Sequence, residues 1–391
     1  MTAHGRARLT AMETRSTRVA FRSSVCVALL LAVALAVAGG YSAARPGPQG
    51  TVLVKQPVLQ WRITPTGGLK ITDCSMTLNG EKVDATYSVE VGALLYRPTQ
   101  PLPAGDYSVE CTVQFDNKWK PQQKWSFTVS KDALDSLPPP DDKQNEGLRA
   151  ANGYRRALGL PDLQMEGSLC ASAQAHAHFL KSNHVFGHFE KEGMANFVGV
   201  KPIDRVESFG HAGGVWEDVA MMRNTPSGFV DQLFNAPYHR LPYMQPGAVP
   251  FGMGCDGRFS CIDFGMTTTE GFITSPATNQ VGIPTSWDGI ELPSPLSVHG
   301  ATGPVGYPIV CAYYAESIET VLVDSASLTG PAGDVPLWVN SSANDPELTN
   351  AIVLMAKSPL QPGVSYEVSV TAHTEAGKKL SKTWRFTTAV Q

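Results

Sequence analysis

A pattern that occurs twice, once near each end of the 391-residue chain, constrains the fold most strongly. In each copy a Pro-Leu segment leads through a glycine to a tyrosine, and a Trp-x-Phe-Thr segment follows. The tyrosine and the tryptophan are eighteen residues apart in both copies, at Tyr107/Trp125 and at Tyr366/Trp384. Apolar residues alternate after each tyrosine, so one face of each strand points inward, as a small β-sandwich requires. The repeat predicts immunoglobulin-like β-domains at residues 51–131 and 284–391.

The block between these β-domains has a different pattern. Three consecutive prolines, Pro138-Pro139-Pro140, indicate a stiff linker at residues 132–143. Helical spacing and few strand formers then predict helices at residues 144–158, 166–182 and 227–235, and strands resume at 249–254 and 260–266. Helices followed by a hairpin are typical of an α+β domain, which we expect at residues 144–283.

The N-terminal segment predicts export. Five arginines and one acid precede residue 23, and an uncharged run from Val25 to Ala38 with small residues at its end follows. This order is typical of a cleaved signal peptide. An uncleaved anchor is the alternative, because no charge occurs between Arg22 and Arg45. We therefore expect residues 1–45 to be a signal peptide or an anchor, the protein to be secreted or in the cell envelope, and membrane contact only through an uncleaved segment.

Charge and cysteines narrow the class of protein further. The net charge is −4 with both signs mixed along the chain, which argues against nucleic acid as a partner. Six cysteines follow the signal, and an even number in an exported chain permits disulfides. Cys255 and Cys261 flank a predicted hairpin turn and could face each other. Cys74 could pair with Cys111, while Cys170 and Cys311 could be bridged or free.

Three short polar segments in the middle block concentrate the chemistry of the chain. They contain His188 with Glu190, Glu217 within Trp216-Glu217-Asp218, and His239 within Ala236-Pro237-Tyr238-His239-Arg240. Two imidazoles and a carboxylate from separate segments can form a cation site or a polar cleft. The sequence contains no Gly-x-Ser-x-Gly elbow, no phosphate loop and no Gly-x-Gly-x-x-Gly motif that follows a predicted strand.

The middle block resembles the bacterial form of the CAP superfamily, which comprises cysteine-rich secretory proteins, antigen 5 and pathogenesis-related 1. The resemblance covers residues 144–270. It depends on the order of several motifs: Asn152 to Pro161, the alanine-rich helix with His176, the His188/Glu190 segment, Asp204-Arg205, Trp216-Glu217-Asp218, Ala236 to Arg240 and Phe251 to Gly254. It implies an α-β-α sandwich with a cleft of two histidines and two acids that can bind a divalent cation.

Within this resemblance His188 and His239 match the two histidines, and Glu217 matches one acid. The helix that carries the second acid in many relatives reads Leu233-Phe234-Asn235-Ala236 here. Glu190, Asp218 and Asp231 are possible substitutes, and water is another. We therefore expect a weakly held cation, with zinc preferred, on His188, His239 and Glu217.

The other polar residues of this block are expected to be structural. His176 lies on an apolar helical face, which is typical of a hydrogen-bonded core histidine. His178 and His211 are expected at the surface or in loops. Arg240 is expected to pair with Asp204-Arg205 and so fix the loop that presents His239.

Two functional classes follow from these features. The resemblance favours a non-enzymatic extracellular module that binds a lipid, glycan, peptide or protein, with the sandwiches as spacers or adhesive modules. The alternative is a metal-dependent hydrolase, a peptidase or an esterase, in which Glu217 is the general base.

Overall fold

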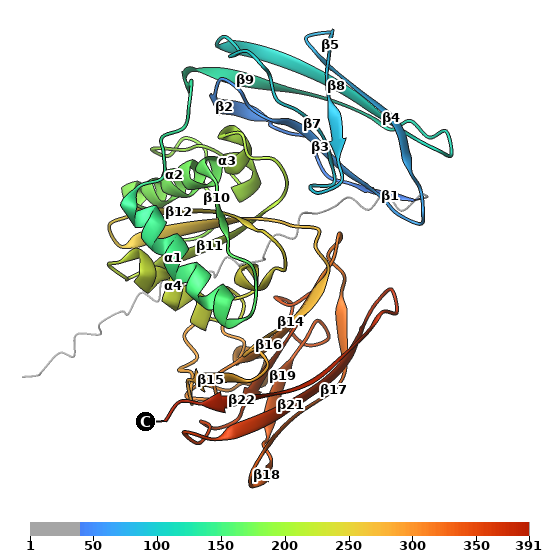
Figure 1. Ribbon diagram of the computed structural model, residues 1–391. Coiled ribbons are helices and arrows are strands. Elements are labelled where there is room, and N and C mark those ends of the chain that lie inside the picture. Colours follow the sequence, from blue (N-terminus) through green and yellow to red (C-terminus); the bar gives the residue numbers. More distant parts are fainter. Residues whose placement is uncertain (1–39, 391) are drawn as a thin grey trace, which may run out of the picture.

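The computed structural model describes residues 40–390, which form three successive units (Figure 1). A β-sandwich lies at each end, and a helix-containing domain lies between them. Residues 1–39 of the signal or anchor expected at residues 1–45 lie outside the described part of the chain. From Tyr41 onward the chain already belongs to the first sandwich.

The N-terminal sandwich consists of two sheets. The first has the strand order β1 (Tyr41–Ala43), β3 (Leu59–Pro65), β7 (Ala93–Tyr96) and β6 (Thr86–Ser88). The second has the order β2 (Gly50–Val54), β9 (Gln122–Leu134), β8 (Gly105–Phe115), β4 (Ile71–Leu78) and β5 (Glu81–Val83). The alternating residues of β8 and β9 turn one face inward, where Val109, Val113 and Phe127 pack with Trp61.

The C-terminal sandwich repeats this topology strand for strand. Its first sheet has the order β14 (Gly271–Ser275), β16 (Ile309–Tyr314), β20 (Ala351–Ala356) and β19 (Leu337–Asn340). Its second has the order β15 (Gln280–Ile283), β22 (Lys379–Thr388), β21 (Ser365–Thr374), β17 (Val321–Gly330) and β18 (Gly333–Asp334). A short 3-10 helix, η2 (Ser297–His299), lies between β15 and β16.

The repeated hairpin seen in the sequence has the same register in both sandwiches. Trp125 lies opposite Val109, and Trp384 lies opposite Val368. The boundaries differ from those expected, because β1 precedes residue 51 and β14 precedes residue 284. Each is short, and no turn-rich linker separates β14 from the preceding domain, so neither has a clear sequence signal.

The middle domain is an α-β-α sandwich, and the predicted α+β fold class is confirmed. Its sheet has the order β10 (Gln164–Met165), β12 (Pro250–Asp256), β13 (Phe259–Gly265) and β11 (Val215–Met221). The helices are α1 (Asp142–Ala157), α2 (Gly167–Asn183), α3 (Pro202–Ser208) and α4 (Pro226–Asn235), with the 3-10 helix η1 (Pro242–Met244). The helix α2 packs on β12 and β13, whereas α1 pairs with α4.

Alternation along β12 explains how helices cover both faces of this sheet. A Cβ on Gly252 would lie 2.1 Å from the backbone of Leu169, and one on Gly254 would lie 2.2 Å from that of Gln174. Both glycines therefore let α2 lie directly against the strand. Met253, between them, points to the other face and contacts Gly147 of α1.

The two sandwiches contact the middle domain in different ways. The C-terminal sandwich shares one hydrophobic cluster with it, in which Phe234 and Tyr243 pack with residues that include Trp287 and Tyr314. This continuous apolar core makes the two domains a single packing unit.

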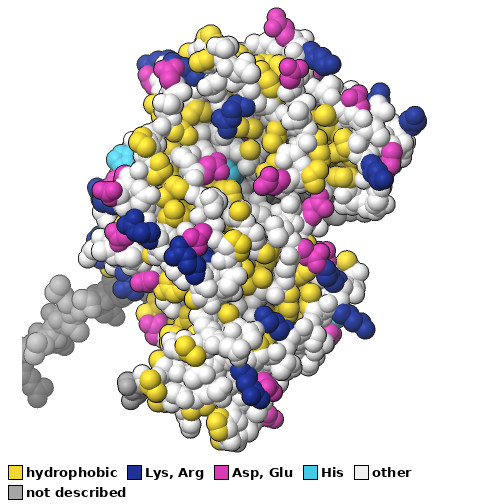
Figure 2. Space-filling view, viewed as in Figure 1, with side chains coloured by type: hydrophobic (Ala, Val, Ile, Leu, Met, Phe, Trp, Pro, Cys, Tyr) yellow, Lys and Arg dark blue, Asp and Glu magenta, His cyan; other side chains and the backbone are white. Residues whose placement is uncertain are grey.

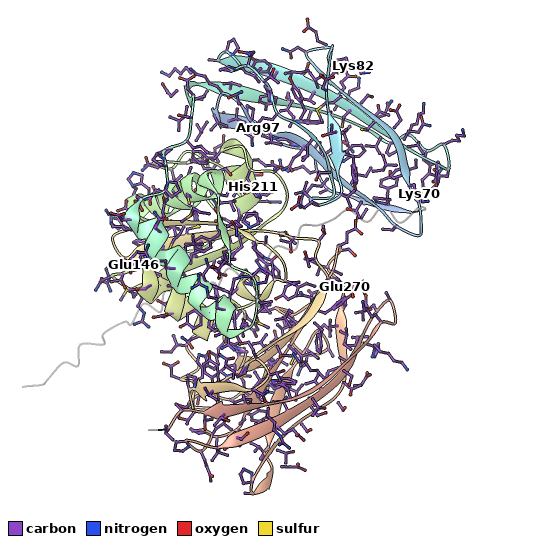
Figure 3. The ribbon with its side chains drawn as sticks, viewed as in Figure 1. Lys70, Lys82, Arg97, Glu146, His211 and Glu270 are labelled. Carbon is purple, nitrogen blue, oxygen red and sulfur yellow. The ribbon has the colours of Figure 1, made fainter. Side chains whose placement is uncertain are left out.

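The N-terminal sandwich makes polar contacts instead. Gln60 donates to the buried Glu207 over 2.9 Å, and Arg97 donates to the Gly210 carbonyl over 3.0 Å. Arg97 and His211 lie on the two sides of this contact (Figure 3). Acidic and basic side chains are interspersed over the face shown in Figure 2.

Candidate functional site

The three polar segments lie near the edge strand β11. His188 is in the loop after α2, Glu217 is on β11, and His239 is in the loop after α4. The Nδ1 atom of His188 lies 3.0 Å from Glu217 Oε1. The Nδ1 atom of His239 lies 2.7 Å from the Oε1 atom of a different acid, Glu291. Each histidine therefore has its own carboxylate.

Glu217 is fully engaged by neighbouring groups. One oxygen contacts His188, and the other accepts from the buried guanidinium of Arg205. Burial alone would raise the pKa of Glu217, but Arg205, His176 and His188 together lower it well below its ordinary range. Glu217 is thus an ionised group that holds His188, and neither of its oxygens lacks a partner.

Among the described residues, one set of three potential metal ligands has its donor atoms within 4.8 Å of one another, and it contains neither His188 nor His239. This set is Glu217, Cys261 and Asp263, all buried. Arg205 already supplies the positive charge there. Burial raises the pKa values of the Cys261 thiol and the Asp263 carboxyl well above their ordinary ranges, which disfavours the deprotonated forms that bind metal ions. These donors do not suit a cation.

His176 lies beneath the same network. Its Nδ1 contacts Glu190 and its Nε2 contacts the carbonyl of Gly187, each over 2.9 Å. His176 is a fully buried core histidine, as predicted. Glu190 is engaged by His176 and by the backbone N–H of Val198, so it is not a spare ligand.

Asp218 points away from Glu217, because successive residues of a strand face opposite sides of the sheet. It is buried, and its Oδ2 atom has no hydrogen-bond partner. Burial raises the pKa of Asp218 to about 7, an effect that His239 and His188 oppose and Glu291 reinforces. Both histidines therefore interact electrostatically with Asp218, which the sequence offered as a candidate for the second acid of the family's cation site.

Glu291 was not predicted from the sequence. It lies between β15 and η2 of the C-terminal sandwich, and its side chain is 0% exposed. Its Oε1 atom accepts from the backbone N–H groups of Tyr238 and His239 as well as from His239 Nδ1. A single acid in a loop of another domain has no local pattern that would have identified it.

The remaining candidates lie elsewhere or have structural partners. Asp231 accepts from the Tyr154 hydroxyl over 2.9 Å. His178 is exposed and contacts Asp256, in agreement with its predicted surface position. His211 lies in a loop, but it is buried and contacts Glu166.

The prediction that Arg240 pairs with Asp204-Arg205 is wrong. Arg240 is buried between the middle domain and the C-terminal sandwich, and it donates to the carbonyl of Phe234 in α4 and to that of Pro308 in the sandwich. Its guanidinium also lies 4.7 Å from the ring centroid of Tyr307. Arg240 does fix the loop that carries His239, but it does so through contacts between domains.

The predicted disulfides are not present among the described residues, in which all six cysteines are free. Cys255 lies opposite Ser260, and Cys261 lies opposite Gly254. The two cysteines are one residue out of register and face opposite sides of the sheet. In the N-terminal sandwich Cys74 lies opposite Val113 rather than Cys111.

Comparison with known proteins identifies the middle domain. The sequence model described as "Cysteine-rich secretory protein family" (CAP) matches residues 148–259. A search of curated proteins finds no match. Among solved structures, an extracellular SCP-domain protein from Bacillus anthracis is 14% identical, with 58% of this chain and 86% of that chain covered and a TM-score of 0.27.

Two further solved structures are similar to parts of the chain or to most of it. CopC from Methylosinus trichosporium is 18% identical over 25% of this chain and 97% of its own, with a TM-score of 0.20. The fibronectin(III)-like modules of Clostridium thermocellum CbhA are 6% identical over 90% of this chain and 94% of their own, with a TM-score of 0.19. These low scores carry no argument about fold or function. The family match therefore covers the middle domain, which has α-β-α layers and lies between two β-sandwiches.

Proposed function

We propose that this chain is an exported CAP-domain protein whose cleft binds an extracellular ligand without catalysing a reaction, and that the cleft can hold a divalent cation. The observation that carries this proposal is the pairing of each cleft histidine with a carboxylate through Nδ1. Metal-binding histidines characteristically donate their second ring nitrogen in this way, which fixes the tautomer and places the lone pair on Nε2.

The donors fit a cation in their chemistry. Two imidazoles and a carboxylate suit zinc, and Asp218 supplies a buried oxygen without a partner. His188, Asp218 and His239 would hold the ion, and Glu217 would position His188. The donors are not clustered within 4.8 Å, so they would have to approach one another. We therefore expect weak, reversible binding.

Exposed apolar side chains beside the histidines support a binding role. Phe186 and Phe189 flank His188 in the sequence and are 47% and 41% exposed. Ile290 and Leu292 flank Glu291 and are both 73% exposed. Exposed apolar groups next to a polar site are typical of a recognition surface. A lipid, a glycan, a peptide or a protein with apolar groups is the expected ligand.

Export is supported by the sequence of the first 45 residues. No helix among residues 40–390 is long and apolar enough to cross a membrane. The proposal therefore places the protein outside the cytoplasm, either released or attached through its N-terminal segment.

The alternative, a metal-dependent hydrolase, retains one supporting observation. Asp218 has a pKa of about 7 as a result of burial, and such an acid can act as a general base near neutral pH. Glu217 is a poor base, because Arg205 and His188 hold both of its oxygens and its pKa is lowered despite burial.

Zinc titration of the purified full chain tests the cation, with metal analysis before and after chelation. The His188→Ala/His239→Ala variant should lose binding, and His178→Ala, which removes an exposed histidine, should retain it. Unchanged affinity in the double variant would eliminate the proposed ligands. Turnover of peptide, ester or glycan substrates that disappears in the same double variant would favour the hydrolase instead.

A further inference from the structure

The C-terminal sandwich contacts the His239 loop of the middle domain through one acidic side chain. Glu291 Oε1 lies 2.7 Å from His239 Nδ1, 3.0 Å from the Tyr238 backbone nitrogen and 3.2 Å from that of His239. Asp345 of the same sandwich accepts from the Tyr238 hydroxyl over 2.5 Å. The loop that presents His239 is therefore held by a neighbouring domain.

The second oxygen of Glu291 has no such partner. Its Oε2 atom is buried and makes no hydrogen bond, and the same holds for Asp218 Oδ2. A buried carboxylate oxygen without a donor is unfavourable, because it has lost its hydration and gained no hydrogen bond in return. Among the described residues, Asp218 and Glu291 are two buried acids that both act on His239. One positive ion in the cleft would compensate both.

We propose that Glu291 completes the cation site of the CAP cleft from the C-terminal sandwich, as the carboxylate that positions His239. It takes for His239 the role that Glu217 has for His188. This inference rests on the proposed function, because it assigns a role within the same cation site. The missing acid of the family pattern would thus be supplied by another domain and not by the helix α4.

The tautomer of His239 follows directly from this arrangement. When a neutral His239 donates from Nδ1 to this carboxylate, its lone pair is on Nε2. The ring is 21% exposed while Glu291 is fully buried, so the acid lies on the protein side of the ring. Docking of the C-terminal sandwich therefore prepares the histidine for a ligand.

The first test is calorimetric titration of the full chain with zinc. Glu291→Gln retains an acceptor oxygen but removes the charge, and loss of such a supporting group lowers metal affinity about 10–100-fold. Glu347→Gln is the matched control, because Glu347 lies near Asp345 and Glu291 in the same sandwich, whereas His239 makes its hydrogen bonds to Glu291. This control should stay within about twofold of the parent chain.

The second test needs no metal and reports the position of the proton directly. Long-range ¹H–¹⁵N spectra of the metal-free chain should show the His239 proton on Nδ1, and Glu291→Ala should abolish this preference. A thermal melt of each variant checks that it remains folded.

The outcomes separate this inference from the proposed function. Zinc binding that His239→Ala abolishes and Glu291→Gln leaves unchanged would overturn the inference alone. Tighter zinc binding by Glu291→Gln would identify Glu291 as a competitor and would also overturn it. No zinc binding by the parent chain would overturn the cation site itself, and the role of Glu291 with it.

Discussion

Replacement of Arg205 by methionine should destabilise the CAP domain more than any surface substitution. Arg205 is 0% exposed, and its guanidinium contacts Glu217, lies 3.7 Å from Glu190 and donates to the His188 carbonyl over 3.0 Å. Without it, two fully buried carboxylates have no permanent cation. Removing one partner of a buried ion pair costs about 3–5 kcal/mol. Each kcal/mol lowers Tm by about 2–4 °C in a domain of 150–250 residues, so a fall on the order of 10 °C follows.

The assay is thermal and urea unfolding, followed by near-ultraviolet circular dichroism. Arg156→Met is the matched control, because Arg156 forms an exposed ion pair with Asp162, and exposed ion pairs contribute little to stability. A loss of stability in Arg205→Met no larger than in this control would refute the argument. It would mean that Glu190 and Glu217 are protonated or solvated, and that the network does not hold His188 in place.

Three further predictions concern pH, packing and thiols. Burial would raise the pKa of Glu217, but Arg205 and the neighbouring histidines lower it below 4.5. The stability that ionised Glu217 contributes is therefore complete above that pH and is lost as the pH falls. In acid unfolding curves, the difference in unfolding free energy between the parent chain and Arg205→Met should become smaller below about pH 4. Gly254→Ala should lower the free energy of unfolding by about 1–3 kcal/mol, because its Cβ would lie 2.2 Å from the backbone of α2, whereas Gly153→Ala, which meets no atom within 4 Å, should not. Mass spectrometry after alkylation of the unfolded, unreduced chain should find Cys255 and Cys261 modified, and a recovered peptide that links them would contradict the strand register.

Much of the fold could be predicted from the sequence because its signals are local. The spacing of apolar residues predicted helices at 144–158, 166–182 and 227–235, and α1, α2 and α4 lie at these positions. The duplicated Tyr-to-Trp interval identified two copies of one hairpin. These features depend on neighbours a few residues away, so a single sequence is sufficient to reveal them.

The elements that were missed have no such local signal. The helix α3 has only seven residues, and β11 contains two acids, Glu217 and Asp218, in a strand that is mostly buried. Those acids are tolerated there because Arg205, His188 and His239, which lie on other elements, favour their charged forms. Glu291 is a more extreme example, because its partner His239 is 52 residues away in another domain. Charge compensation across such distances appears only when the chain is folded.

Anomalous scattering at the zinc edge, from crystals grown with zinc, would locate the bound ion. We predict one peak in the CAP domain, within bonding distance of the Nε2 atoms of His188 and His239 and beside Asp218. A peak at Glu217, Cys261 and Asp263, or none in the cleft at saturating zinc, would contradict this prediction.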